Sequence, residues 1–128
     1  MKTLTVKQPF AHLICIGIKD IENRTWKTNH RGTILIHAGL KPDKKPLDIG
    51  RELTYVQKEI IIAQAEMYKT YLFGAIMGQV DIVDCVQNHP SEWAEPNHWH
   101  WVLENPILFD VPIRNVKGHL SLWDYPLK

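Results

Sequence analysis

The densest group of chemically active residues in this sequence lies around Lys19, Glu22 and Arg24. A lysine and a glutamate in a concave, partly dry site hold each other ionised, whereas burial alone pushes each toward its neutral form. Depending on that balance, the pair performs acid–base chemistry or binds a polar ligand. The planar guanidinium of the arginine can donate hydrogen bonds to oxygen atoms of such a ligand. The alternative is a structural ion-pair network that pins a strand to a helix.

Whether these side chains converge depends on the local backbone. Side chains alternate between the faces of a strand, so Asp20, Glu22 and Arg24 share one face and Lys19 points to the other. Gly17 is suited to the left-handed cap that ends a helix. If residues 17 to 19 still turn with the helix end, Lys19 swings to the side of Glu22. We therefore expect a polar cleft at this helix-to-strand junction.

Lys7 and Gln8 form a second candidate site, because they precede a predicted helix. The free amide groups at a helix start can hold a phosphate or a carboxylate, and a neighbouring lysine reinforces this. An ordinary strand end with solvated side chains explains the two residues equally well.

The alternating run His98-Trp99-His100-Trp101 places both histidines on one strand face and both tryptophans on the other. Zinc sites favour at least three protein ligands, and His89 is the only near candidate for the third. Structural or surface histidines are the better interpretation, so we predict no metal and no cofactor.

Composition limits the class of protein. The 128 residues are 45% hydrophobic and 23% charged, which is typical of one soluble globular domain, and we expect a single domain over residues 1–128. A formal net charge of +1 offers no bulk attraction for a polyanion, so any nucleic-acid contact must be local. Cys15 and Cys85 lie in apolar runs, as expected of reduced thiols in the cytoplasm. Neither a secretory signal nor a membrane helix is predicted.

Strands are predicted where β-branched and alternating residues recur between turn signals. The predicted strands are Leu4–Gln8, Lys19–Trp26, Thr33–Ala38, Gly74–Val86, Trp99–Leu103, Phe109–Ile113 and Gly118–Trp123. Gly78 would ease the curvature of a barrel strand. The loop from Asn88 to Asn97 carries Trp93 and could cover the cleft, although packing of such a loop on its own aromatic residue is commoner.

Two helices are predicted. A short one begins at Pro9 and ends at Gly17. A longer one of about six turns follows Asp48 as its cap and places one apolar stripe on the core. The stripe consists of Ile49, Leu53, Val56, Ile60, Ala63 and Met67. Strands in this order with two helices favour an α+β barrel over a doubly wound sheet.

Gly17, Lys19, Glu22 and Arg24 reproduce the signature GxKxxExR, and the chain therefore resembles the ASCH family, named for its homology to an activating signal cointegrator. The resemblance spans nearly the whole chain. It extends to LTVKQP at Leu4–Pro9, RTW at Arg24–Trp26, HAG at His37–Gly39, ENP at Glu104–Pro106 and LW at Leu122–Trp123.

The resemblance implies an α+β fold, a PUA-like mixed β-barrel of about six strands with one short and one long helix. It also implies a cleft for RNA, a nucleoside or a nucleotide beside the first helix, with Lys19, Glu22 and Arg24 as its polar lining. Arg24 would bind a phosphate or carbonyl oxygen, and Trp26 would stack on a base. The expected ligand-binding residues are Lys7, Gln8, Arg24, Thr25 and Trp26. No membrane partner is expected, and the oligomeric state stays open.

Two alternatives accompany this prediction. Some proteins that resemble the family are amidohydrolases of N4-acetylcytidine, which use a lysine, a threonine three residues later and a remote glutamate. Lys19 matches the lysine and would act as the base, Glu22 stands at the threonine position, Thr25 is nearby, and Glu104 could supply the remote acid. Lys19, Glu22 and Glu104 are therefore the candidate catalytic residues. The other alternative is a protein-interaction domain without a small ligand.

Overall fold

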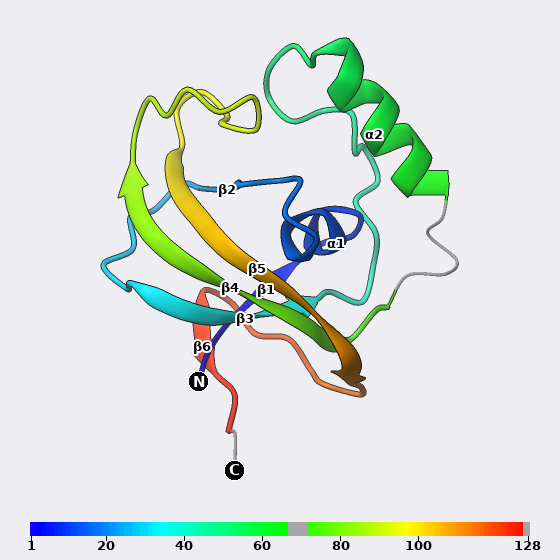
Figure 1. Ribbon diagram of the computed structural model, residues 1–128, viewed down its shortest axis with the longest axis vertical. Coiled ribbons are helices and arrows are strands. Elements are labelled where there is room, and N and C mark those ends of the chain that lie inside the picture. Colours follow the sequence, from blue (N-terminus) through cyan, green and yellow to red (C-terminus); the bar gives the residue numbers. More distant parts are fainter. Residues whose placement is uncertain (67–71, 127–128) are drawn as a thin grey trace.

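The computed structural model describes residues 1–66 and 72–126, and one curled sheet dominates it (Figure 1). The strands are β1 (Lys2–Val6), β2 (Ile21–Arg24), β3 (Gly32–Ala38), β4 (Ala75–Val86), β5 (Trp99–Ile113) and β6 (Leu122–Asp124). The helices are α1 (Phe10–Cys15) and α2 (Tyr55–Glu66).

The sheet is mixed and runs in the order β2-β5-β4-β3-β1-β6. β1 is parallel to β3, and the other neighbouring strands are antiparallel. The sheet curls into a half-barrel (Figure 1). It does not close into a full barrel, because β2 and β6 remain edge strands. This confirms the predicted α+β fold with a mixed sheet of six strands, one short helix and one longer helix.

Helix α1 fills the curl of the sheet and packs against β1, β3, β4 and β5. Phe10, Leu13 and Ile14 are buried there with the apolar faces of the strands. Pro9 precedes the helix, and Gly17 follows it with φ +82°, a conformation that glycine adopts without strain. The short helix and its glycine end are confirmed.

Strand β5 corrects the prediction of two separate strands around Asn105. The ladder with β4 pairs Asp81 with Glu104 and Gln79 with Ile107, so β5 carries one residue more than β4 in this interval. Asn105 takes φ +54°. The extra residue forms a bulge that accommodates Pro106 within a continuous strand, since proline is tolerated where the ladder is interrupted.

Helix α2 also differs from its prediction, because it does not begin at Asp48. It begins after Thr54, where the hydroxyl of Thr54 accepts a hydrogen bond from the Gln57 amide and the Gln57 side chain accepts one from the Thr54 amide. This reciprocal capping box is the stronger start signal. Ile49 and Leu53 are buried, but they reach the core from the preceding loop.

The predicted apolar stripe of α2 is confirmed only in part, since Ile60 packs against the core. Val56 and Ala63 are exposed, whereas Gln57 and Ile61 are the buried residues of the helix. Met67 lies outside the described residues. Over residues 1–66 and 72–126, no helix combines the length and the apolar character needed to cross a membrane.

Replacing Gly78 on β4 tests how closely β4 and α1 approach. A β-carbon at this position would lie 2.7 Å from Cys15 Sγ and closer still to the Ile107 carbonyl oxygen, which is backbone and cannot rotate away. Gly78→Ala should therefore lower the free energy of unfolding by about 2 kcal/mol in urea titrations. Gly39→Ala is the control, since its β-carbon would meet nothing closer than 3.6 Å. Equal stability of the two variants would contradict this packing.

Candidate functional site

The end of α1 decides where Lys19 points. The amides of Ile18 and Lys19 both donate to the Leu13 carbonyl at 3.0 Å, so the chain keeps turning past Gly17. β2 begins only at Ile21, and Lys19 is therefore free of the strand alternation. The turn brings Lys19 to the side of Glu22, as the sequence suggested.

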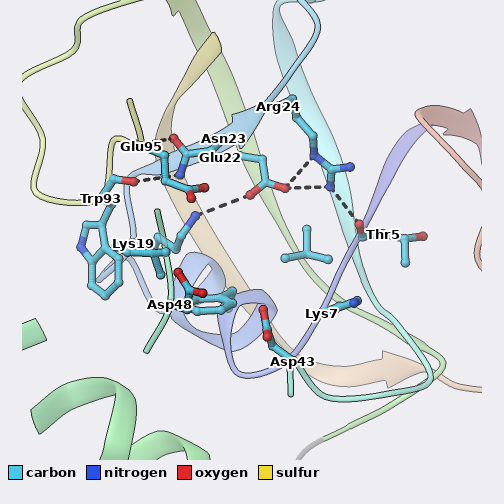
Figure 2. A pocket seen from close by; sticks show the side chains of 13 residues that line it. Thr5, Lys7, Lys19, Glu22, Asn23, Arg24, Asp43, Asp48, Trp93 and Glu95 are labelled. Atoms are coloured by element: carbon cyan, nitrogen blue, oxygen red, sulfur yellow. Dashed lines mark hydrogen bonds and ion pairs between the residues drawn. The ribbon is translucent and has the colours of Figure 1, made fainter. Parts of the chain in front are cut away.

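Glu22 lies at the centre of a charged network (Figure 2). Its Oε1 lies 3.5 Å from the Lys19 ammonium nitrogen, and its Oε2 accepts from Arg24 Nε at 3.0 Å and Nη2 at 2.8 Å. The same Nη2 donates to the Thr5 carbonyl at 3.0 Å. The Glu22 carboxylate thus joins Lys19, in the turn that follows α1, to Arg24 at the end of β2, and Arg24 extends the connection to β1.

The network is largely buried, with the side chains of Lys19 and Glu22 only 6% and 9% exposed. Burial raises the pKa of Glu22, but the charges and hydrogen bonds of Lys19 and Arg24 outweigh it, and the pKa lies below its ordinary value of 4.5. Lys19 also donates to the Ile21 carbonyl and lies 5.7 Å from the centre of the Phe10 ring. Each of these neighbours attracts a positive charge.

The network forms one wall of a hollow of about 360 Å³. Phe10 and Trp93 supply aromatic surface, and Lys7 lies at the lining with its side chain exposed. Carboxylates outnumber basic groups in the lining, which contains Glu22, Asp43, Asp48 and Glu95 against Lys7, Lys19 and Arg24 (Figure 2). The hollow is therefore suited to a ligand that offers hydrogen-bond donors.

Glu95 is a lining residue that the sequence analysis missed. The side chain of Asn23 on β2 donates to the Trp93 carbonyl at 2.9 Å and accepts from the Glu95 amide at 2.9 Å. These bonds hold the loop between β4 and β5 against the hollow. Burial raises the pKa of Glu95 above its ordinary value of 4.5, and the charges of His98 and Lys19 offset this only in part.

Of the residues predicted to bind a ligand, Lys7 and Arg24 line the hollow and Gln8 does not. Gln8 is fully buried, and its side-chain oxygen accepts from the His12 amide at 2.9 Å. Its amide nitrogen donates to the Leu72 carbonyl at 3.1 Å. Gln8 itself therefore occupies a helix amide that was expected to hold a phosphate.

Thr25, Trp26 and Glu104 also lie outside the lining. Trp26 is partly buried and packs edge-on against Trp101, with ring centres 4.8 Å apart, so it does not form a wall of this hollow. Glu104 is exposed on β5 opposite Asp81, and Thr25 is exposed just beyond β2. Glu95, not Glu104, is the remote carboxylate that reaches the network.

His100 has a structural role. It is buried, accepts from the His89 amide at 3.0 Å through Nδ1, and contacts the Glu95 carbonyl at 2.6 Å through Nε2. Both ring nitrogens are thus used to hold the loop that carries Glu95. In the part of the chain that the structure describes, no group of three or more His, Cys, Asp or Glu side chains is arranged to hold a metal ion.

Comparison with known proteins finds a matching domain family and similar sequences. The profile of the ASCH domain matches residues 4–113. Activating signal cointegrator 1 of Homo sapiens is 36% identical over 129 residues, which covers 94% of this chain and 21% of that protein. Activating signal cointegrator 1 of Mus musculus is 34% identical over 130 residues, with the same two shares covered. The chain thus spans about a fifth of the length of these relatives.

Glu22→Gln tests the ion network through its pH dependence. The variant leaves two cations near a neutral amide, so the free energy of unfolding near neutral pH should fall by about 3 kcal/mol. In the folded chain the pKa of Glu22 lies below its ordinary value of 4.5, so at pH values between the two the unfolded chain binds more protons than the folded chain. The stability of the wild type therefore decreases as the pH falls below 4.5. The difference between wild type and variant should therefore shrink in acid.

Urea titrations across the acid range measure this difference, with the exposed Glu104→Gln as the control. A gap between wild type and Glu22→Gln that stays constant into acid would show that Glu22 gains nothing from its two partners.

Proposed function

The chain belongs to the ASCH domain family, and from this premise we propose that it binds RNA or a nucleoside through the hollow formed by Lys19, Glu22 and Arg24. The PUA-like fold of the family implies nucleic-acid binding in general. The specific proposal depends on one observation, a small hollow with a preformed charged wall.

The size of the hollow favours a single nucleoside unit. Small-molecule sites range over roughly 300–1,000 Å³, so a volume of about 360 Å³ accommodates a small ligand rather than a duplex. Phe10 and Trp93 provide the apolar surface that such sites combine with a few oriented polar groups.

The charges of the hollow favour a base with an amino group. Within residues 1–66 and 72–126, no ion pair engages the carboxylates of Asp43, Asp48 or Glu95. Carboxylates accept hydrogen bonds from exocyclic amino groups, as Asp and Glu do from the amino group of cytosine. No hydrogen bond in the same ranges engages Nη1 of Arg24, whose side chain is 26% exposed, so it can donate to a carbonyl oxygen of the base.

A second candidate function, hydrolysis of an acylated nucleoside, is favoured by Glu95. Its raised pKa makes this carboxyl a better proton carrier near neutral pH than an ordinary glutamate. Glu95 would take a proton from water as the water oxygen attacks the acetyl carbon of N4-acetylcytidine, and would return it to the leaving nitrogen. The products are cytidine and acetate. The Lys19 ammonium, positioned by its ion pair with Glu22, would stabilise the negative charge that develops on the acyl oxygen.

Calorimetric titration with cytidine and uridine tests the binding proposal. Cytidine, which carries an amino group, should bind about tenfold more tightly than uridine. Glu95→Ala should remove most of this preference, because the carboxylate that accepts from the amino group is lost. Glu104→Ala is the matched control and should bind as wild type. Equal affinities of the two variants, or no binding of any nucleoside, would contradict the proposal.

The hydrolase proposal is tested by incubation with N4-acetylcytidine and chromatographic detection of cytidine. Turnover should be lost in Lys19→Ala and reduced by about two orders of magnitude in Glu95→Gln, which cannot carry a proton. Glu104→Gln should retain full turnover. Failure of wild type to release cytidine would exclude this activity, and failure to bind as well would favour a protein-interaction domain.

A further inference from the structure

A second hollow, of about 320 Å³, is lined by residues of β6 and of the chain on either side of it. β6 is the edge strand opposite β2 in the sheet order, and Figure 1 shows its place near both chain termini. We call it the aromatic-basic hollow. The residues that give it its character are Arg114, Lys117, His119, Trp123, Asp124 and Tyr125. None of them lines the hollow beside Lys19.

The basic side chains of this hollow are available for a ligand. Arg114 and Lys117 are exposed, and over residues 1–66 and 72–126 neither side chain has an ion-pair or hydrogen-bond partner. Asp124 supplies the opposing charge in the lining, but its carboxylate is paired with Lys2 at 3.3 Å. The aromatic-basic hollow therefore presents unpaired positive charge, in contrast to the internally paired charges around Glu22.

Aromatic rings lie next to these cations. The Trp123 ring packs edge-on against His119 and Tyr125, with ring centres 4.9 and 6.3 Å away. Its indole nitrogen donates to the Thr5 hydroxyl at 3.2 Å, so the ring cannot turn freely. Trp123 and Tyr125 are both partly exposed and offer ring surface to a flat ligand.

Hydrogen bonds hold the aromatic-basic hollow in shape. The Thr5 hydroxyl also bonds to His37 Nδ1 at 3.1 Å, and His37 Nε2 lies 2.7 Å from the Val116 carbonyl. A neutral His37 with its proton on Nε2 satisfies both contacts, with Thr5 donating to Nδ1, and burial lowers the pKa of His37 in agreement with this form. The backbone of Tyr125 pairs with Met1 in both directions.

We propose that the aromatic-basic hollow is a second contact site for single-stranded nucleic acid, separate from the hollow beside Lys19. Arg114 and Lys117 bind backbone phosphates, and Trp123 and Tyr125 stack against a base. Exposed cations beside fixed aromatic rings form the combination by which single strands are bound without sequence readout. The proposal does not depend on a nucleoside occupying the first hollow.

Fluorescence anisotropy with a labelled single-stranded RNA of mixed sequence, repeated over a salt series, tests this site. Arg114→Ala/Lys117→Ala should weaken binding at low salt at least tenfold and reduce the slope of log affinity against log salt by about 1.4, since each phosphate contact on a single strand contributes about 0.7. Lys41→Ala/Lys58→Ala removes the same charge from exposed lysines elsewhere and should leave the slope unchanged.

The stacking role is tested at Tyr125. Tyr125→Leu should weaken RNA binding about tenfold, and Tyr125→Phe, which keeps the ring, should restore it. Equal slopes for the two double variants, equal affinities of the Leu and Phe variants, or no binding of RNA by wild type would overturn the proposal. Binding of an acidic peptide in preference to RNA would also overturn it and assign the hollow to a protein partner.

Calorimetry with cytidine separates the two sites. Arg114→Ala/Lys117→Ala should bind cytidine as wild type does if the first hollow takes it. A loss of cytidine binding in this variant would show that the two hollows are not separate and would overturn the proposal. RNA binding that depends on Arg114 and Lys117 in a chain without cytidine affinity would support the second site while contradicting the first.

Discussion

The guanidinium of Arg24 connects β2, at one edge of the curled sheet, to β1, the strand next to the other edge. Arg24 lies on the edge strand β2, and it donates to Glu22 on its own strand and to the Thr5 carbonyl on β1, four strands away in the sheet order. β6 pairs with β1 as far as Leu4, so Thr5 lies just past that pairing, and its carbonyl accepts from Arg24 across the open side of the half-barrel. The hollow lies beside this bridge, since Thr5 and Arg24 both line it together with Phe10 of α1.

Thr5 connects the two hollows, although they have opposite electrostatic character. Its carbonyl accepts from Arg24 on one side, and its hydroxyl accepts from Trp123 and bonds to His37 on the other. Around Glu22 the cations are neutralised by a buried carboxylate, and such a pair costs desolvation energy that only good geometry recovers. Beside β6, Arg114 and Lys117 are exposed, and no ion pair engages them within residues 1–66 and 72–126, so they could bind a polyanion.

The sequence predicted those features of the site that depend on residues close together in the chain. Gly17 predicted a helix end, and the continued turn placed Lys19 beside Glu22 against the strand alternation. Glu95 and Gln8 were not predictable in this way, because Asn23 fixes Glu95 across 72 positions and Gln8 finds its partner Leu72 across 64. The start of α2 could have been predicted from the Thr54–Gln57 capping box. The apolar spacing from Ile49 onward indicated an earlier start instead, and tertiary packing did not follow that spacing.

The division of charge also bears on how a chain with a formal net charge of +1 would recognise a nucleic acid, as we propose. Long-range attraction is weak for such a chain, so affinity must come from a few contacts at short distance. In this proposal the hollow beside Lys19, whose excess of carboxylates repels phosphate, would select for the base, and the exposed cations of the aromatic-basic hollow would bind the backbone. Each alone would bind weakly, but two such contacts on one strand act at a high effective concentration and strengthen each other. Thr5 on β1 accepts hydrogen bonds from both Arg24 and Trp123, so the surroundings of the two proposed contacts are connected through one strand.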